Sequence, residues 1–558
     1  MKKLSKVVIL GASCLLLAAC RNANNSISDA STFKASIELT ISSGDIKGKK
    51  DTDNDVLEWL GIPYATADRW QAPENVTKWS GTFDATEYGD VAIQLANGAV
   101  TGSEDALNLD VVRPDSEEAD LPVIVYLHGG NNQTGSSQEI KGSSFVNDIN
   151  AVYVSVNYRL GALGFNPLEA LKTGTNEENS GNYSLLDIAT ALDWVEKNIE
   201  TFGGDKDNVT LAGFSAGGRD VMATLISPLF EGKYDKAISF SGGMTLSDEA
   251  ESQDIFATAI APLVVEDGVK PTEEAAKAWL LTKGADVEDY LKGISAERLA
   301  SLMGNAAIRM SVFPHLYKDG TVIPEEGFDT ETYNDVPLML VTGKNEFSLF
   351  AAYDNRFASD FTSGELFADE EKLAEFTYVK RYGGQLYRLA NGVESARTIS
   401  DKYSSDIYIG EIAYGDNSEV TPDLARTFGA FHGIFEPMLQ IPSNYATIIG
   451  DAFETEGTAT MSADFKAYLK HFLASGNPNA DGLTEWEAWT SANQVLSIDA
   501  STDSAQIKSS ADTDTASDIL EAMSADTSLS EETKKELDTT VLNGRWFSLA
   551  IDEKYDEE

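Results

Sequence analysis

A serine set among glycines constrains the fold of this chain more than any other feature. Residues 208–223 read NVTLAGFSAGGRDVMA, an apolar β-type run followed by Gly-x-Ser-x-Gly and then a helical pattern. Glycines two positions before and after Ser215 permit a turn so tight that the serine adopts a strained backbone and exposes its hydroxyl. Ser215 is therefore a candidate nucleophile. The alternative is a plain glycine-rich turn, and partner residues elsewhere in the chain decide between the two.

The charge balance excludes one large class of partner. With 42 Lys and Arg against 90 Asp and Glu, the 558-residue chain has a formal net charge of −48 and a pI of about 4.3. Because this surface would repel phosphates, we expect no nucleic-acid partner. The apolar content of 42% is typical of a globular protein with a large core.

The first twenty residues, MKKLSKVVILGASCLLLAAC, predict export. Three lysines precede an apolar run too short for a membrane span, which indicates a signal peptide over residues 1–19. The final LAAC resembles the lipobox of bacterial lipoproteins, in which the cysteine that follows the cut is acylated. We expect a lipid anchor on Cys20 in a bacterial cell envelope and a flexible tether over residues 20–32. An ordinary secretory signal is the alternative. Cys14 is the other cysteine, so no disulfide is expected after cleavage.

The body of the chain alternates predicted strands with predicted helices. Helical spacing occurs at residues 185–199 and 464–474, and a helical excursion is expected between Ser247 and Met310. Apolar, β-branched runs indicate strands buried on both faces, hence a parallel or mixed sheet covered by helices. These runs are residues 121–130, 151–159, 209–214, 236–240, 336–342 and 494–498. The prediction is one α/β domain over residues 33–558.

Two polar segments need separate treatment. Alternating aspartates from Asp51 to Asp55 resemble the start of a calcium loop, but Val56 occupies its glycine position and no glutamate closes it. A hairpin turn is therefore expected there. Residues 501–526 are rich in Ser, Asp, Thr and Ala, and we expect an acidic, loosely held insertion over residues 501–540.

Six further blocks accompany the serine turn. They are LGIPYA at residues 60–65, SED at 103–105, HGG at 128–130, NYRLG at 157–161, GNY at 181–183 and FGGD at 202–205. In this order and spacing they resemble the type-B carboxylesterases, the cholinesterase-like branch of the α/β-hydrolases. The resemblance extends from about Phe33 to Ile498. It implies an α/β-hydrolase fold, with a central, mostly parallel mixed sheet flanked by helices and helical insertions around the active site.

The resemblance also implies which histidine is the catalytic base. The chain contains four histidines. His432, in GAFHG, matches the family's histidine loop. His128 belongs to the glycine loop, His315 matches a segment that lines or borders the pocket, and His471 lies on the late predicted helix.

An acid completes the implied triad. Glu346, in GKNEF, follows the predicted strand at residues 336–342, where the family places its glutamate. The chain order serine, glutamate, histidine is that of an α/β-hydrolase. Ser241 resembles the serine that supports the acid. Arg159 and Glu104 are expected to form a structural ion pair.

The glycine loop implies an oxyanion hole. Backbone N–H groups must point at the oxygen that becomes charged, and glycines leave no side chain in the way. By resemblance the donors are the amides of Gly130, Asn131 and Ala216. Asn131 departs from the pattern, since the family usually has Gly or Ala there, and its side chain is expected to narrow the acyl site. Phe214 replaces the glutamate that commonly precedes the nucleophile.

The resulting hypothesis is a lipid-anchored serine carboxylesterase acting on small to medium carboxylic esters. His432 would take the proton of Ser215, Glu346 would orient the imidazole, and an acyl-serine would form and be hydrolysed. No metal or cofactor is required. A lipase acting on aggregated lipid is the close alternative. A non-catalytic cholinesterase-like binding protein is the other, although such proteins usually lack a triad residue.

Overall fold

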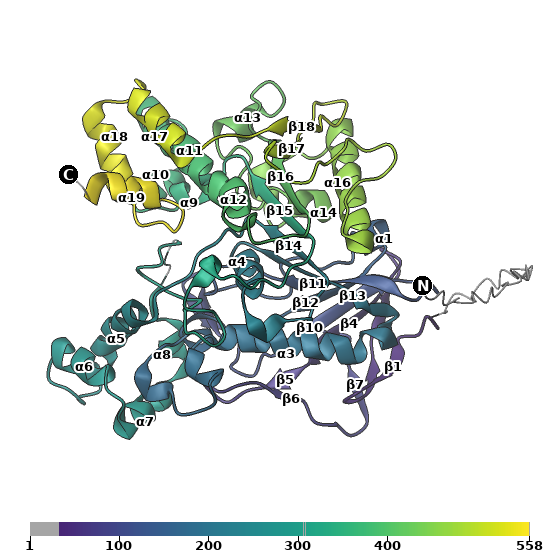
Figure 1. The fold of residues 1–558 in the computed structure, drawn as a ribbon, viewed down its shortest axis with the longest axis vertical. Helices are drawn as coiled ribbons and strands as arrows, with labels where there is room; N and C mark the ends of the chain where they lie inside the picture. The colour runs from purple at the N-terminus through teal and green to yellow at the C-terminus, as the bar shows by residue number, and fades with distance from the viewer. Residues whose placement is uncertain (1–32, 305, 307, 557–558) are drawn as a thin grey trace, which may run out of the picture.

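An eleven-stranded mixed sheet runs through the computed structural model, which describes residues 33–304, 306 and 308–556 (Figure 1). The predicted signal peptide, the tether and the Cys20 anchor lie outside the described residues. From one edge to the other the strands are β18 (Lys508–Ala511), β17 (Gln494–Ile498), β16 (Ile407–Ile412), β15 (Leu338–Gly343), β14 (Lys236–Phe240), β13 (Gly204–Phe214), β11 (Leu121–Leu127), β12 (Val152–Val156), β10 (Asn108–Pro114), β4 (Val56–Pro63) and β3 (Lys49–Asp51).

The strands between β12 and β17 are all parallel to their neighbours. Strands β3, β4 and β10 extend one edge antiparallel, and β18 closes the other edge antiparallel to β17. The central strands are buried along almost their whole length, as expected for a sheet covered on both faces. All six apolar runs predicted as strands are strands of this sheet, which confirms that prediction; β16 was not predicted.

Shorter strands form three small sheets in the amino-terminal part of the described chain. They are β1 (Glu38–Ile41), β2 (Gly44–Lys47) and β7 (Thr82–Asp84) in one sheet, β5 (Ala65–Thr66) with β6 (Glu74–Asn75), and β8 (Gln94–Ala96) with β9 (Ala99–Thr101). The predicted hairpin is present, because β3 pairs antiparallel with β4 across the aspartate-rich turn. Asp51 accepts hydrogen bonds from the amides of Asp53 and Asn54 and so caps that turn.

Helices flank the sheet. The first group in the chain comprises α1 (Val146–Ile149), α2 (Gly161–Gly164), α3 (Tyr183–Asn198) and α4 (Ala216–Thr224). Helix α4 packs against β11, β13 and β14, and α16 (Glu456–Ser475) packs against β11 and β13. The predicted late helix is therefore confirmed and is longer than predicted. Within the described residues, no helix combines the length and the apolar character needed to cross a membrane.

Two groups of helices extend to one side of the sheet (Figure 1). The predicted excursion forms the lower group, α5 (Glu249–Glu266), α6 (Glu273–Leu280), α7 (Ala285–Gly293) and α8 (Ala296–Ala300). Asp248, Thr272 and Ser295 cap α5, α6 and α8 by accepting hydrogen bonds from first-turn amides. The upper group is α9 (Ser348–Ala352), α10 (Ala358–Ser363), α11 (Glu370–Leu389), α12 (Ser395–Ile399), α17 (Ala516–Ala525), α18 (Glu531–Leu537) and α19 (Leu549–Asp556), and short helices α13 (Pro422–Arg426), α14 (Glu436–Leu439) and α15 (Ala446–Ile449) complete the fold.

Residues 501–540 differ from the loosely held insertion that we expected. They contribute β18 to the edge of the main sheet and the helices α17 and α18 to the upper group. Thr515 and Asp518 form a capping box at the start of α17, and Ile519 and Met523 bury one face of it. Two apolar residues spaced four apart were enough to anchor a helix that composition alone made look unstructured.

The expected ion pair between Arg159 and Glu104 is absent, and that prediction was wrong. Arg159 instead binds Asp187 on α3 through two guanidinium nitrogens at 2.8 and 2.7 Å. Glu104 pairs with Arg69. Both Arg159 and Asp187 are buried, so each requires the other's charge, whereas the partly exposed Glu104 is satisfied at the surface.

Candidate active site

Ser215 lies at the sharp turn between β13 and α4. Its backbone has φ 54° and ψ −115°, a strained conformation for a residue with a side chain. A Cβ on Gly213 would overlap the carbonyl of Gly217, and a Cβ on Gly217 would overlap the carbonyl of Leu127. The glycines therefore allow the strand, the turn and the helix to approach this closely. The Ser215 amide donates to the carbonyl of Phe240 at 2.8 Å, which ties the turn to β14.

Glu346 and His432 are in direct contact, although 86 residues separate them. The Glu346 Oε2 atom lies 2.5 Å from His432 Nδ1. Glu346 is fully buried just beyond β15, and its other oxygen, Oε1, accepts from Ser241 Oγ at 2.6 Å, from Thr342 Oγ1 at 2.9 Å and from the Gly343 amide at 2.5 Å. Such a set of donors stabilises the carboxylate and holds it in one orientation.

The other imidazole nitrogen is left for Ser215. His432 Nε2 is buried and has no hydrogen-bond partner among the described residues. Ser215 Oγ likewise makes no hydrogen bond with a described residue, and both side chains line the same cavity. Catalytic hydrogen bonds are often long or misaligned until substrate binds. The structure thus brings Ser215 and the Glu346–His432 pair to one cavity, with the serine–histidine hydrogen bond not formed.

Three backbone amides near Ser215 are unused. Within the described part of the chain, the N–H groups of Gly130, Asn131 and Ala216 donate to no protein acceptor. Ala216 is the first residue of α4, so its amide is one of those that a helix leaves unpaired. Gly130 and Asn131 have φ values of 105° and 56° and line the cavity. The residues predicted to form the oxyanion hole therefore have the free donors that such a hole requires.

The Asn131 side chain does not point freely into the acyl site. Its Oδ1 accepts from Arg219 Nη2 at 2.8 Å, and its Nδ2 donates to Gln133 at 3.0 Å. Asn is among the residues that tolerate a left-handed backbone, which explains how a side chain is accommodated here. Arg219 was not predicted to have any role, and its position on α4 gave no signal of this contact.

The cavity has a volume of about 770 Å³ and is lined mainly by apolar side chains. Its walls include the glycine loop, the β8–β9 hairpin, the end of α8 and the helix α9. Phe214 and Phe350 lie beside the His432 ring, with ring centroids 4.7 and 5.0 Å away. The cavity therefore presents the imidazole edge within a mostly apolar surface.

A carboxyl group that was not predicted also lines the cavity. Glu139 Oε2 accepts from the Gly129 amide at 2.9 Å and from the Tyr126 hydroxyl at 3.0 Å, and it forms no ion pair with a described residue. Burial raises the pKa of Glu139 to about 7, against these two hydrogen bonds, and Glu436 adds to the rise. An acidic residue ten positions after a glycine loop carries no sequence signal of its own.

The other three histidines have structural surroundings. His128 is buried, stacks on Tyr158 with ring centroids 4.5 Å apart, and lies 2.8 Å from the carbonyl of Gly129 through Nδ1. Burial lowers the pKa of His128 to about 4. His315 is fully buried beside Phe313 and does not line the cavity, so of the two expected positions it does not have the lining one. His471 is exposed on α16.

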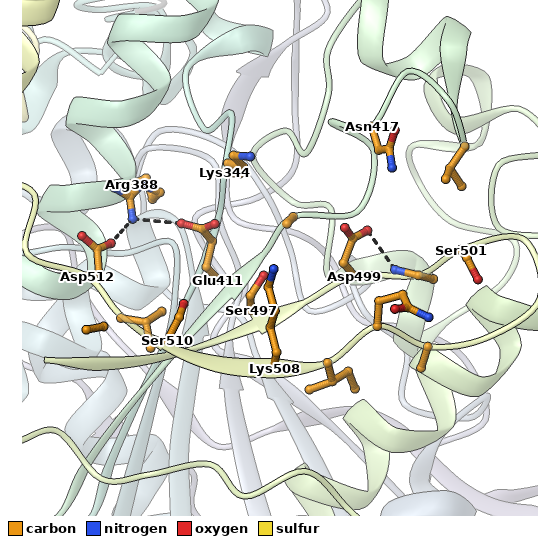
Figure 2. A pocket seen from close by; sticks show the side chains of 18 of the residues that line it. Lys344, Arg388, Glu411, Asn417, Ser497, Asp499, Ser501, Lys508, Ser510 and Asp512 are labelled. Atoms are coloured by element: carbon orange, nitrogen blue, oxygen red, sulfur yellow. Dashed lines mark hydrogen bonds and ion pairs between the residues drawn. The ribbon is translucent and has the colours of Figure 1, made fainter. Parts of the chain in front are cut away.

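A second, larger cavity of about 950 Å³ lies at the β16–β18 edge of the sheet (Figure 2). It is polar, and several of its charges are paired, whereas Lys508 forms no ion pair with a described residue. Arg388 binds Glu411 at 2.9 Å, Asp514 at 3.0 Å and also Asp512.

Over the described residues, no group of three or more His, Cys, Asp or Glu is arranged to hold a metal ion.

Comparisons with known proteins point to one family. The model of the Carboxylesterase family matches residues 35–432. A para-nitrobenzyl esterase from Bacillus subtilis is 34% identical over 337 residues, which are 58% of this chain and 66% of that relative. The human carboxylesterase 3 is 26% identical over 551 residues, covering 88% of this chain and 91% of that protein.

Solved structures give the same result for the fold. A PNB esterase superposes with a TM-score of 0.58 and 25% identity, over 85% of this chain and 97% of that one. A carboxylesterase from Geobacillus stearothermophilus superposes with a TM-score of 0.63 and 23% identity, over 85% and 97%. The α/β-hydrolase fold expected from the sequence is confirmed.

Proposed function

This chain belongs to the carboxylesterase family and is a carboxylic ester hydrolase, and on that premise we propose that it cleaves small to medium esters through an acyl-serine intermediate. Ser215 is the nucleophile, His432 the general base and Glu346 the group that orients it. The supporting observation is that Ser215, the Glu346-bound His432, Gly130 and Asn131 line one cavity, and that the amides of Gly130, Asn131 and Ala216 donate to no described protein acceptor.

Acylation begins when Ser215 Oγ attacks the ester carbonyl while its proton passes to His432 Nε2. A bound ester brings the hydroxyl and the imidazole into line. Negative charge on the carbonyl oxygen is stabilised by the amides of Gly130, Asn131 and Ala216, and loss of one such donor typically costs about 3 kcal/mol. The imidazolium is stabilised by Glu346, which also keeps the proton of the resting ring on Nδ1.

Collapse of this intermediate releases the alcohol, which takes its proton from His432. Water then enters, His432 removes one of its protons, and attack on the acyl-serine forms a second oxyanion in the same place. Its collapse returns the proton to Ser215 and frees the carboxylic acid. The residues of this chain carry every step.

The cavity supports the proposed substrate size. A volume of about 770 Å³ lies within the range of sites for drug-sized molecules, roughly 300–1,000 Å³. Leu302, Leu349 and Phe350 supply apolar walls for the acyl or alcohol chain. We therefore expect turnover of 4-nitrophenyl esters with short and medium acyl chains.

Replacement of the nucleophile tests the proposal. Ser215→Ala should abolish hydrolysis of 4-nitrophenyl butyrate and covalent labelling by a fluorophosphonate probe, with an unchanged circular dichroism spectrum. Ser497→Ala, in the polar cavity of Figure 2, is the matched control and should retain both. Undiminished turnover by Ser215→Ala would overturn the assignment.

The lipase alternative predicts a different dependence on substrate. An esterase that binds single molecules should follow saturation kinetics with tributyrin below its solubility limit and gain nothing above it. A jump in rate on crossing that limit would favour a lipase. The test needs only the wild-type protein and a titration of one substrate.

We also propose that the protein is exported and anchored by a lipid on Cys20. The support is the signal-like segment at residues 1–19 and the cysteine directly after it. Metabolic labelling with an alkyne fatty acid in a bacterial host should mark the wild type and leave Cys20→Ser unmarked. Equal labelling of the two would contradict the anchor.

A further inference from the structure

Two consecutive asparagines in the glycine loop have left-handed backbones. Asn131 has φ 56° and Asn132 has φ 55°, directly after Gly130. Asn adopts this conformation more readily than most residues with a side chain, but usually as a single residue, so two in succession need contacts that hold them. The amide of Asn131 is one of the proposed oxyanion donors, so whatever imposes this conformation also sets the direction of that donor.

Two consecutive residues of α4 hold the two asparagines. Arg219 Nη2 donates to Asn131 Oδ1 at 2.8 Å, and Asn132 Nδ2 donates to Asp220 Oδ1 at 2.8 Å. The Arg219 amide also donates to the carbonyl of Ser215 at 2.9 Å. The loop that carries two oxyanion donors is thereby tied, side chain to side chain, to the first turns of the helix that begins after the nucleophile.

Both α4 residues are buried at a cost to the fold. Arg219 is 2% exposed and forms no ion pair with any described residue, and its other contact is the Met310 sulfur at 3.9 Å. Burial lowers the pKa of Arg219. Asp220 is fully buried, its Oδ2 atom has no hydrogen-bond partner within the described chain, and burial raises its pKa to about 7.

A buried charge without a partner is destabilising, and apolar side chains of similar volume generally stabilise such a position better. Packing alone therefore does not account for an Arg-Asp pair in the core. Neither residue lines the cavity, so neither can contact the substrate directly. Their hydrogen bonds to the loop are what distinguishes them from other core residues.

Resting on the function proposed above, we propose that Arg219 and Asp220 are positioning residues that clamp the oxyanion loop to the nucleophile's helix. The clamp fixes the distance between the Asn131 amide and Ser215 Oγ. A loop released from it would still bind the uncharged ester but would meet the developing oxyanion with misdirected donors. The loss should therefore appear in kcat rather than in KM.

Three variants remove or retain the clamp with little change in shape. Asn131→Gly keeps the amide and suits the positive φ but deletes the acceptor. Arg219→Met keeps most of the volume but deletes the donor, while Arg219→Lys retains a donor. We expect Asn131→Gly and Arg219→Met each to lower kcat about 10- to 100-fold with KM changed less than about threefold, and Arg219→Lys to recover part of the loss. The double variant Asn131→Gly/Arg219→Met should have a kcat no lower than that of the less active single variant, because both substitutions remove the same contact.

Arg113 provides the matched control. It is also fully buried without an ion pair among the described residues, and it donates to the carbonyls of Pro114, Phe202 and Glu118 at the opposite end of the sheet. Arg113→Met should lower the melting temperature but leave kcat unchanged. The same pattern in Arg219→Met would assign Arg219 a merely structural role and overturn the proposal.

A trifluoromethyl ketone gives a readout independent of turnover. Ser215 Oγ adds to its carbonyl carbon, the hydroxyl proton passes to His432, and the carbonyl oxygen becomes an oxyanion. Its inhibition constant should weaken in Asn131→Gly and Arg219→Met by the same factor as kcat/KM. Unchanged inhibition, or turnover within about twofold of wild type, would overturn the clamp alone. Turnover that survives Ser215→Ala would instead overturn the proposed function and the clamp with it.

Discussion

Two large cavities of this protein differ in how their polar groups are satisfied. In the cavity at the β16–β18 edge, Arg388 binds Glu411 and Asp512, as Figure 2 shows, and it also binds Asp514. Lys344 binds Asp416 at 2.9 Å. Around Ser215, the amides of Gly130, Asn131 and Ala216 and the Nε2 atom of His432 have no protein partner among the described residues. The paired cavity is the larger of the two, at about 950 against 770 Å³.

This contrast shows that neither size nor polarity marks a reactive site. Most buried polar groups in folded proteins are hydrogen-bonded, so unpaired ones require an explanation. Charges that pair with one another, as they do around Arg388, stabilise an edge of the sheet and are less available to a ligand. Donors that are kept unpaired around a nucleophile can stabilise charge that develops only during the reaction. Each prediction below perturbs one of the two sites, and three of the four take their reference variant from the other.

The largest effect is expected from the acid beside His432. Glu346→Gln removes the acceptor that orients the imidazole, and kcat for 4-nitrophenyl butyrate should fall about 10,000-fold. The same substitution in the polar cavity, Glu411→Gln, should leave kcat within about twofold, since Glu411 only pairs with Arg388. Equal losses in the two variants would remove the distinction between the cavities.

The second largest effect is expected on the free energy of unfolding, from a substitution in the polar cavity. Arg388→Met leaves Glu411 and Asp512 unpaired at side-chain exposures of 16% and 14%, so the free energy of unfolding in urea should fall by about 3 kcal/mol. Turnover per folded molecule should not change. As a control, the exposed Arg381→Met should cost less than about 0.5 kcal/mol. A loss of kcat without a loss of stability would show that this cavity serves the reaction.

The stability of the protein should depend on pH through Glu139, the carboxyl group that lines the Ser215 cavity without an ion pair to a described residue. Burial raises the pKa of Glu139 to about 7. A carboxyl with a raised pKa in the folded state binds its proton more tightly there than in the unfolded chain. It therefore lowers stability progressively as pH rises from about 4.5 to about 7, and the penalty then stays constant.

Glu139→Gln should remove this penalty. The stability of the variant relative to wild type should rise by about 2 kcal/mol between pH 4.5 and pH 8, after allowance for the partial exposure of the side chain. Urea unfolding at the two pH values measures it. A difference that does not vary with pH would contradict the assignment to Glu139. Glu411→Gln is the comparison, because Arg388 compensates that carboxylate.

The smallest effect is expected from the serine that supports the acid. Ser241→Ala removes one of the donors to Glu346 Oε1 but leaves Thr342 and the Gly343 amide in place. We expect kcat to fall about tenfold, or about 1.4 kcal/mol, with KM unchanged. Ser510→Ala in the polar cavity should have no effect. An unchanged kcat in Ser241→Ala would show that two donors suffice to hold the carboxylate.

Much of the fold was predictable because strands and turns follow local rules. Apolar β-branched runs marked six central strands, and two glycines marked the strained turn at Ser215. Strand β16 was missed, although its sequence IYIGEI is mostly apolar, because a single short run between polar segments is ambiguous. The edge strand β18, KSSA, is too polar to be recognised without its partner β17.

The residues of the site also fall into those that the sequence predicts and those that it does not. The order of Ser215, Glu346 and His432 and the glycine loop are visible in the chain, and their catalytic roles remain predictions to be tested by substitution. Glu139, Arg219 and Asp220 carry no motif, so no reading of the chain singles them out. Arg219 and Asp220 contact residues 88 positions away in sequence, and Glu139 contacts the Gly129 amide across a turn of the glycine loop.

The sequence by itself determined the α/β alternation, the serine turn, the family and the acidic character of this protein, because each depends on neighbouring residues or on totals. Tertiary structure alone decided which charges pair and which remain unpaired. With 90 acidic and 42 basic side chains, the chain permits a great many ion pairs. Arg159 pairs with Asp187 rather than with Glu104, because a buried charge can pair only with a group that folding brings within reach.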